Sequence, residues 1–158
     1  LSVLDLGIIR TRKRSGRGTL LTDDLRRRGQ ELGRALRPIL SRDVGAVCAE
    51  SYSLPRNASA SGMIGRAWGV VDTLTDELAL PVLSASPQAI KKATTGRRSA
   101  SKQMVQAALD LVTGGGLGVL LRDQVSQRGL WEHPADAVGA VWALRHTDAL
   151  RLAMRATG

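Results

Sequence analysis

A short, almost wholly apolar run over residues 44–49 ends directly in a carboxylate, Glu50. A run of this length is typical of a strand buried on both faces of a sheet. A second short strand is expected at 81–83, and apolar residues at helical spacing between 64 and 78 predict a core helix that joins the two. Strand and helix thus alternate over short connections, which predicts a layered α/β domain with a partly parallel sheet.

The other apolar patterns add one strand region and several helices. Residues 1–9 are expected to form one strand or two short ones, and residues 114–118 a flexible linker. The predicted helix starts are Thr22 as an N-cap, Ser86 with Pro87, Ser99 or Ser101 as an N-cap, and Pro134. Gly96 should end the helix that begins at Ser86 and Pro87. The helix after Ser99 or Ser101 should turn inward the residues Met104, Val105, Ala108, Leu109 and Val112. The helix that begins at Pro134 should continue toward Arg151.

Charge is the unusual feature of the composition. The 158 residues include 23 Lys and Arg against 14 Asp and Glu, a net charge of +9, of which residues 1–42 carry +7. Such a balance points to a polyanionic partner, with nucleic acid the leading candidate. With 43% hydrophobic residues the chain can form a buried core, and its length suits a single domain over 1–158.

Several classes of protein do not fit. Cys48 has no second cysteine to pair with and no zinc-ligand spacing surrounds it, which indicates a reducing compartment. The sequence shows neither an apolar run long enough for a membrane span nor a signal peptide, so no membrane partner is expected. The chain begins with Leu1, and we expect a segment upstream of it.

Three residues are candidates for chemistry. Ligands gather at the carboxyl ends of strands in parallel sheets, where Glu50 lies, although a strand-end glutamate can simply be hydrated by the following loop. His133 and Asp136, three residues apart near a helix start, can reach one cation, while an aspartate there is also ordinary pairing with the helix dipole. With the basic chain, the combination makes a metal site acting on phosphodiesters plausible.

Four segments in order resemble the RuvC-type Holliday junction resolvases. The first is Cys48-Ala49-Glu50, followed by Arg56-Asn57-Ala58, residues 65–70 and Leu80-Pro81-Val82. The others are Gln88 to Ala93, Gly96 with Ser99 to Lys102, and His133-Pro134-Ala135-Asp136-Ala137, where a histidine stands for the first aspartate of the family's closing motif. The resemblance implies an RNase H-like fold, a mixed five-stranded sheet flanked by helices. It also implies a homodimer that cuts branched DNA in recombination or repair.

The same resemblance implies a catalytic set. Glu50, His133 and Asp136 would be ligands of two Mg²⁺ ions, for which Mn²⁺ can substitute, and Lys91 and Lys102 would stabilise charge at the scissile phosphate. A solvated surface role is the alternative for both lysines. We further expect nucleic-acid contacts from Arg12, Lys13, Arg14, Tyr52, Arg56, Lys92, Arg97 and Arg98.

Two departures from the family pattern stay open. The family's first ligand is an aspartate on the first strand. Asp5-Leu6-Gly7 matches its context but lies too close to the next helix, so we expect residues 4–11 to be the third strand, with the first strand and its aspartate upstream of Leu1. Residues 114–130 lengthen one connection and are either a DNA-contacting insertion or a structureless loop.

Other functions stay open as well. One alternative is a noncatalytic RNase H-like DNA-binding module, and another is a nuclease for flaps and forks. The expected location is the cytoplasm, in association with the nucleoid. If the gene belongs to a mobile element, the expected location is the cytoplasm of the host.

Overall fold

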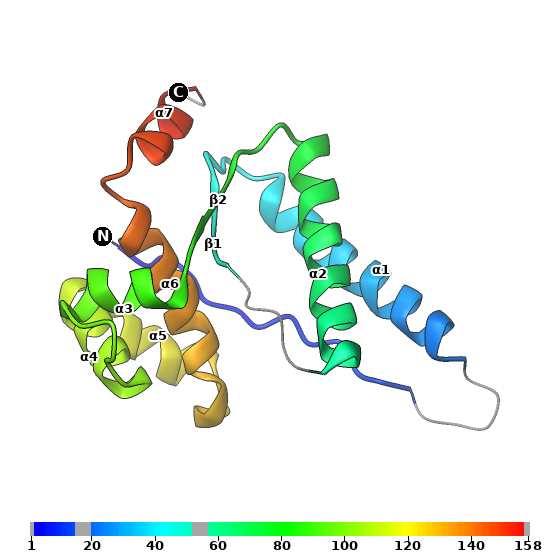
Figure 1. Cartoon of the computed structure of the whole chain (residues 1–158), viewed down its shortest axis with the longest axis horizontal. Coiled ribbons are helices and arrows are strands. Elements are labelled where there is room, and N and C mark those ends of the chain that lie inside the picture. The colour runs from blue at the N-terminus through cyan, green and yellow to red at the C-terminus, as the bar shows by residue number, and fades with distance from the viewer. Residues whose placement is uncertain (1, 15–19, 52–56, 157–158) are drawn as a thin grey trace.

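The computed structural model describes residues 2–14, 20–51 and 57–156. These residues form a helix-rich α/β structure with one small sheet (Figure 1). In chain order the elements are α1 (Leu21–Leu40), β1 (Val47–Glu50), α2 (Ala58–Glu77), β2 (Val82–Ala85), α3 (Pro87–Thr95), α4 (Lys102–Val112), α5 (Gly116–Gln124), the 3₁₀ turn η1 (Arg128–Leu130), α6 (Glu132–Leu144) and α7 (Asp148–Ala156).

The sheet consists of β1 and β2, which pair in parallel with α2 as their crossover helix. Val47 lies opposite Val82 and Glu50 opposite Ala85. The parallel pairing expected from the sequence is confirmed, but in the described residues the sheet has two strands instead of five. Residues 2–9 form no strand, because a strand needs a partner ladder and the Leu6 amide instead donates to Oε1 of Gln124, at 2.7 Å.

Two groups of helices lie on either side of the strands. α1 packs along α2 on one side, and α3, α4, α5 and α6 gather on the other (Figure 1). The main core belongs to the second group, where the largest fully buried side chains are Ile90, Leu109, Leu117 and Leu121. α2 is therefore not a core helix as expected, since it buries only Leu74 and Thr75 and packs mainly on α1. β1 is half-buried along its length, because no further strand of the described residues covers it.

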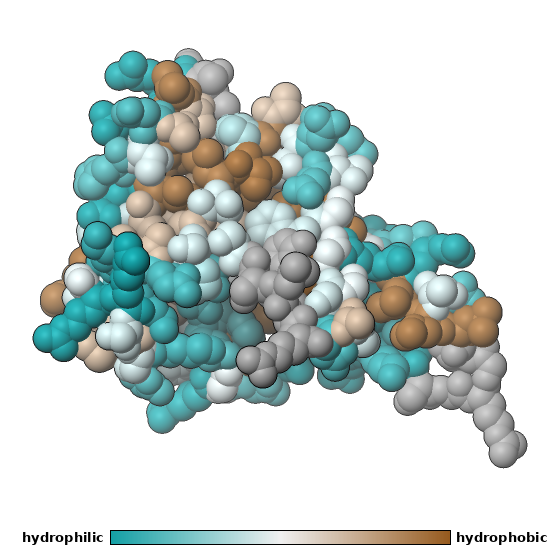
Figure 2. Space-filling view, viewed as in Figure 1, coloured by the Kyte–Doolittle hydropathy of each residue, from teal (hydrophilic) through white to brown (hydrophobic). Residues whose placement is uncertain are grey.

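The surface reflects this arrangement. Figure 2 shows mostly hydrophilic side chains over α3 and α4, and apolar ones between α7 and the strands. A second exposed apolar group, Leu20 and Leu21, lies where α1 begins.

Helix starts and ends largely follow the sequence signals. The hydroxyls of Ser86 and Ser101 accept the amides of Ala89 and Met104, each at 3.2 Å, and Gly96 ends α3 with a φ of 76°. Thr22 is not an N-cap, because α1 begins two residues earlier than expected, after Leu20, whose carbonyl accepts the amides of Asp23 and Asp24.

The long connection over 114–130 is an ordered part of the core. Gly114 and Gly115 adopt positive φ of 63° and 82°, a conformation that glycine adopts without steric cost, and α5 follows at once. α5 buries Leu117 and Leu121 completely. The expectation of a flexible linker over 114–118 and that of a structureless loop over 114–130 are therefore wrong, because the apolar side chains of this segment pack into the core of the helical bundle.

Two smaller expectations about helices are also wrong. Met104 is 45% exposed rather than inward-facing, since it lies on the outer side of α4. The last helix does not run on to Arg151, because the chain bends over residues 145–147 between α6 and α7.

No single helix among the described residues is long and apolar enough to cross a membrane; α4 and α5 reach that length and hydropathy only as a pair bent by 113°.

Candidate active site

Glu50 is the last residue of β1 and is half-buried. Its backbone lies opposite Ala85, the last residue of β2, so the carboxylate lies at the carboxyl end of the parallel pair. α6 packs against β1 and closely against α3 and α4, which brings residues distant in sequence to this end of the sheet. Glu50 thus lies where the fold gathers side chains from four elements.

Asp136, in the first half of α6, is the second carboxylate of the site. It is half-buried, between Pro134 and Ala135, which are buried, and the exposed Ala137. The negative charge of Asp136 is close enough to act on Glu50 and raise its pKa. The structure therefore brings these two predicted residues together.

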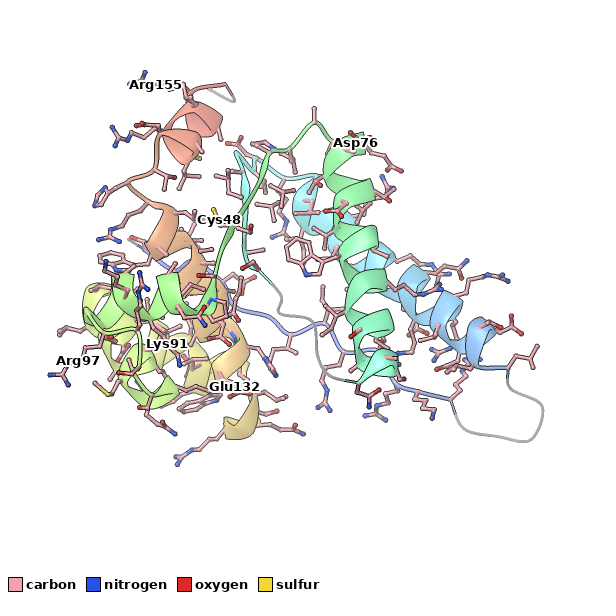
Figure 3. The ribbon with its side chains drawn as sticks, in the orientation of Figure 1. Cys48, Asp76, Lys91, Arg97, Glu132 and Arg155 are labelled. Carbon is pink, nitrogen blue, oxygen red and sulfur yellow. The ribbon has the colours of Figure 1, made fainter. Side chains whose placement is uncertain are left out.

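Two lysines flank the carboxylate pair. Lys91 lies on α3 and is half-buried, and Lys102 is the first residue of α4 and is exposed. The Nζ of Lys102 donates to Oε2 of Glu132 at 2.5 Å. Figure 3 shows Lys91 and Glu132 in the same region of the molecule, where α3 and α6 meet. The charges of both lysines reach both Glu50 and Asp136.

Burial dominates the electrostatics of the carboxylate pair. Burial raises the pKa of Glu50, and the neighbouring Asp136 raises it further, while Lys102 and Lys91 oppose the shift. Burial also raises the pKa of Asp136, against the opposing charges of Lys102, His133 and Lys91. Burial is therefore the main reason why both carboxyl groups hold protons more tightly than usual, and protons compete with any cation for such a pair.

His133 lies beside this pair, with its ring exposed. Its charge lowers the pKa of both Asp136 and Glu132, so it is a neighbour of the carboxylates. It also borders a cavity of about 400 Å³ with residues 7–10 of the extended N-terminal segment. Within 2–14, 20–51 and 57–156, no three His, Cys, Asp or Glu side chains lie close enough to hold one metal ion, so a shared ligand set of Glu50, His133 and Asp136 stays a prediction.

The basic segment ahead of α1 is tied down by its backbone. The amide of Arg14 donates to Oδ1 of the buried Asp24 at 3.0 Å, and Nη2 of Arg27 donates to the carbonyl of Arg12 at 2.5 Å. The side chains of Arg12, Lys13 and Arg14 are exposed. The backbone of this segment is therefore bonded to Asp24 and Arg27, which also pair with each other, and the side chains of Arg12, Lys13 and Arg14 take no part in that attachment.

The other predicted DNA contacts divide into two groups. Lys92, on the same helix as Lys91, is exposed, and so are Arg97 and Arg98 in the connection that follows α3. Tyr52 and Arg56 lie outside the described residues.

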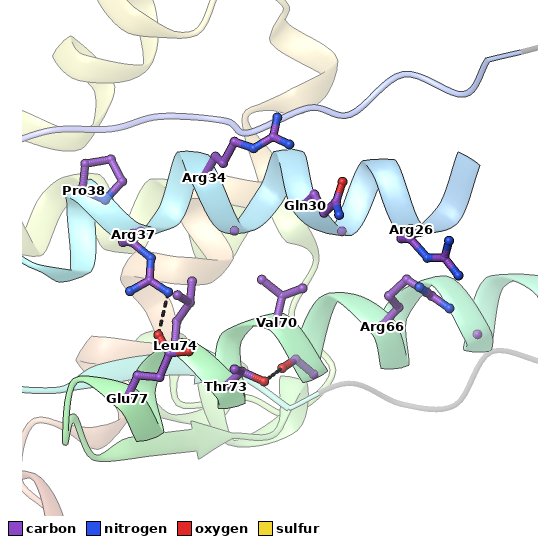
Figure 4. A pocket seen from close by; sticks show the side chains of 14 residues that line it. Arg26, Gln30, Arg34, Arg37, Pro38, Arg66, Val70, Thr73, Leu74 and Glu77 are labelled. Carbon is purple, nitrogen blue, oxygen red and sulfur yellow. Dashed lines mark hydrogen bonds and ion pairs between the residues drawn. The ribbon is translucent and has the colours of Figure 1, made fainter. Parts of the chain in front are cut away.

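A large groove in the described part of the chain lies between α1 and α2. It measures about 1,120 Å³ and is lined by Arg26, Arg34, Arg37 and Arg66, with the glycines of both helices along it (Figure 4). Arg37 donates to Oε2 of Glu77 at 2.5 Å across it. Because the groove shares no lining residue with the Glu50 and Asp136 pair, it is not the active site.

Comparison with known proteins identifies the family. The family described as "Crossover junction endodeoxyribonuclease RuvC" matches residues 1–113, more than two thirds of the chain. The chain belongs to the RuvC family. Its activity class is therefore that of a crossover junction endodeoxyribonuclease, a hydrolase that acts on DNA, and the family is metal-dependent.

Solved structures support the RuvC fold. A structure of Thermus thermophilus RuvC is similar with a TM-score of 0.62 and 22% identity, covering 80% of this chain and 74% of the other. T. thermophilus RuvC in complex with a Holliday junction substrate is similar with a TM-score of 0.58 and 19% identity, covering 92% of this chain and 77% of the other. No curated protein sequence matches.

Two residues next to the candidate site were not predicted from the sequence. Glu132 accepts a hydrogen bond from Lys102. Trp131 lines two adjoining cavities, the first of which Lys102 and Glu132 also line. Their signal was their place in the sequence, directly before His133, but the pairing of Glu132 with a residue thirty positions earlier depends on how α4 and α6 pack.

Proposed function

We propose that this chain is a divalent-metal-dependent endonuclease that cuts Holliday junctions and similar branched DNA in recombination or repair. The observation that carries the proposal is the half-buried pair Glu50 and Asp136, flanked by Lys91 and Lys102. Hydrolysis of phosphodiesters by metal ions needs carboxylate ligands, and a nearby cation that stabilises the phosphate helps. Membership of the RuvC family supports the same chemistry.

The residues present suit a magnesium centre. Carboxylate oxygens are preferred ligands of Mg²⁺, and the raised pKa values of Glu50 and Asp136 indicate charge that a metal would neutralise. Glu50, Asp136 and His133 would hold two Mg²⁺ ions, or Mn²⁺ in their place, with an aspartate as the fourth ligand. Asp5, exposed on the extended segment, is the candidate among the described residues. When bound, the ions supply Lewis-acid activation of the attacking water and the leaving 3′ oxygen.

The protein's own side chains then act on the phosphate. Lys91, which is half-buried and near both carboxylates, would stabilise the negative charge that develops on the phosphate. Lys102, held in place by Glu132, would do the same. Glu132 is a positioning residue in this scheme, because it acts through Lys102.

Binding of the DNA would rest on the basic surface. Arg12, Lys13 and Arg14 present exposed cations from a backbone fixed to α1, and Lys92, Arg97 and Arg98 do so near the active site. Tyr52 and Arg56 complete the proposed set. The relative from T. thermophilus, whose structure holds a Holliday junction, supports branched DNA as the ligand.

A homodimer follows from the geometry of the substrate. Resolving a four-way junction takes one cut in each of two strands, whereas a chain with one carboxylate pair supplies one active site. Two copies of this chain would provide the two cuts. We place this dimer in the cytoplasm, associated with the nucleoid, or in the host cytoplasm if the gene belongs to a mobile element. Residues 1–158 would form one nuclease domain.

The test is cleavage of a four-way junction by Glu50→Gln. The substitution keeps the shape of the side chain and removes its charge, so we expect cleavage in Mg²⁺ to fall at least about 100-fold with junction binding retained. Glu77→Gln is the matched control, because Glu77 lies in the groove between α1 and α2. Gel-based cleavage and binding assays measure both quantities.

Three outcomes would contradict parts of the proposal. Cleavage by Glu50→Gln at the wild-type rate would remove the mechanism. Binding of the junction by the wild type without any nicking in Mg²⁺ or Mn²⁺ would indicate a noncatalytic module. Cleavage of flaps or forks in preference to four-way junctions would indicate a nuclease for flaps and forks instead of a junction resolvase.

A further inference from the structure

A groove beside the active site is lined by residues to which the proposed function gives no role. It consists of two adjoining cavities of about 230 and 310 Å³, which share Gln103, Gln106 and Trp131 as lining residues. The first cavity also includes Lys102, Glu132 and Asp136, so it opens directly onto the active site. The second continues past α4 to Arg122 on α5. We call these two cavities together the Trp131 groove.

We propose that the Trp131 groove binds the DNA strand next to the scissile phosphate and contacts an unpaired base in it. This inference rests on the proposed function, because it takes its substrate from that site. Junction DNA suits such a groove because bases at a branch point can leave their stack. Once unstacked, a base presents its ring face and its hydrogen-bonding edge to the protein.

Trp131 provides a rigid aromatic wall. Its indole Nε1 donates to the carbonyl of Val125 at 3.0 Å, and the residue packs against the main core. The Cζ atom of Arg128 lies 5.7 Å from the ring centroid, which adds a cation to the same wall. A fixed aromatic ring beside a guanidinium is the combination that proteins use to hold bases of single strands without regard to sequence.

Gln103 and Gln106 add hydrogen-bonding groups on one side of α4. They are three residues apart on the helix, so they share a face, and both line both cavities. Neither amide has a hydrogen bond to another described residue, and Gln103 is exposed. An amide can donate and accept at once, as base edges do, so these two side chains can distinguish one base from another.

The charges of the groove suit phosphates. Three carboxylates line the groove. Asp136 belongs to the proposed metal site, Glu132 is held by Lys102, and Oδ1 of Asp110 accepts the amide of Gly118 at 2.7 Å, so the last two already have partners within the protein. Arg122 is exposed and has no ion pair within the described residues, and Arg128 is exposed as well. The groove therefore offers two arginines to the backbone of a strand that leaves the active site.

The first experiment measures base preference. The wild type and Gln103→Ala/Gln106→Ala cut a set of four-way junctions that differ only in the bases beside the cut. We expect the ratio between the best and the worst junction to shrink about fivefold or more in the variant, since one good contact to a base edge is worth at least that much. Gln30→Ala, on the exposed side of α1, should keep the wild-type ratio.

The second experiment measures binding without cleavage. In Ca²⁺, the salt dependence of junction affinity should lose about one phosphate contact in Arg122→Ala and none in Arg155→Ala. Arg155 is exposed at the opposite end of the molecule from Glu132 (Figure 3). A 2-aminopurine beside the cut should be quenched by the wild type and by Trp131→Phe, which keeps an aromatic wall.

The outcomes separate the two proposals. If the wild type cuts junctions but the glutamine variant has the same base preference, the groove does not read bases and this inference is overturned while the proposed function stands. If the wild type cuts no branched DNA, the proposed function fails. In that case an unchanged salt dependence in Arg122→Ala would overturn the inference separately.

Discussion

At the scale of single residues, the pKa values of Glu50 and Asp136 connect pH to metal binding. Both are raised, chiefly by burial, and a carboxylate must be ionised to bind a cation. We therefore expect cleavage in limiting Mg²⁺ to decline on acidification at a higher pH than ordinary carboxylates would give. Because protons and metal compete, tenfold more Mg²⁺ should move the decline to lower pH. Rate profiles at two Mg²⁺ concentrations measure this, and superimposable profiles would contradict it.

The same shift predicts how stability depends on pH without metal. A carboxyl group whose pKa is raised on folding holds its proton more tightly in the folded state. The stability that such a group contributes to the folded state is fully present below its pKa in the unfolded chain and is lost as the pH rises through its pKa in the folded protein. At neutral pH and in EDTA, metal-free Glu50→Gln should thus unfold at a higher temperature than the wild type. Glu77→Gln, which loses an exposed ion pair, should show no such gain.

At the scale of elements, the packing of α6 on α3 depends on the absence of a side chain at Gly139. A Cβ there would lie 2.7 Å from Cγ2 of Ile90, which is fully buried and branched at Cβ and so cannot move aside. We expect Gly139→Ala to destabilise the protein by about 1–3 kcal/mol, despite the better helix propensity of alanine. Chemical denaturation measures the free energy of unfolding.

Gly65 in α2 is the matched control for this prediction. A Cβ at Gly65 would meet nothing within 4 Å, so only helix propensity changes. Gly65→Ala should stabilise the protein by about 0.5–1 kcal/mol. Equal effects of the two substitutions would show that the contact with Ile90 does not limit the packing of α6.

At the scale of the whole molecule, the positive charge is concentrated at one end of the chain and is held outward by α1. Because the backbone at Arg12 and Arg14 is bonded to α1, their side chains and that of Lys13 are free for phosphates. Replacing all three by alanine should lower the slope of log affinity against log salt by about three. Titrations of a labelled junction at several salt concentrations measure the slope.

Charge alone must be separated from position in this test. Replacing Arg151 and Arg155 on α7 by alanine also removes positive charge, but from the far end of the molecule. We expect this variant to keep the wild-type slope. A slope that falls equally in both variants would mean that the segment before α1 has no special role in binding.

The sequence predicted local structure well where a short signal decides it. The capping serines and Gly96 act through contacts within one turn, so the bounds of α3 and the start of α4 could be predicted closely. Residues 2–9 show the limit, because an apolar extended segment becomes a strand only if another strand lies beside it. Residues 114–130 show it too, since their glycines suggested a linker while the buried face of α5 depends on α4 and on the core that it joins.

By itself, the sequence determined the chemical identity of the site and its order along the chain: Glu50 at a strand end, the lysines on two later helices, and Asp136 on the last helix of the core. Only the tertiary structure decided that Asp136 acts on Glu50, that Glu132 holds Lys102, and that Trp131 borders a groove leading away from them. Local signals reach over a few residues, whereas these contacts join residues on different elements and arise from how α6 and the turn before it pack against β1, α3 and α4.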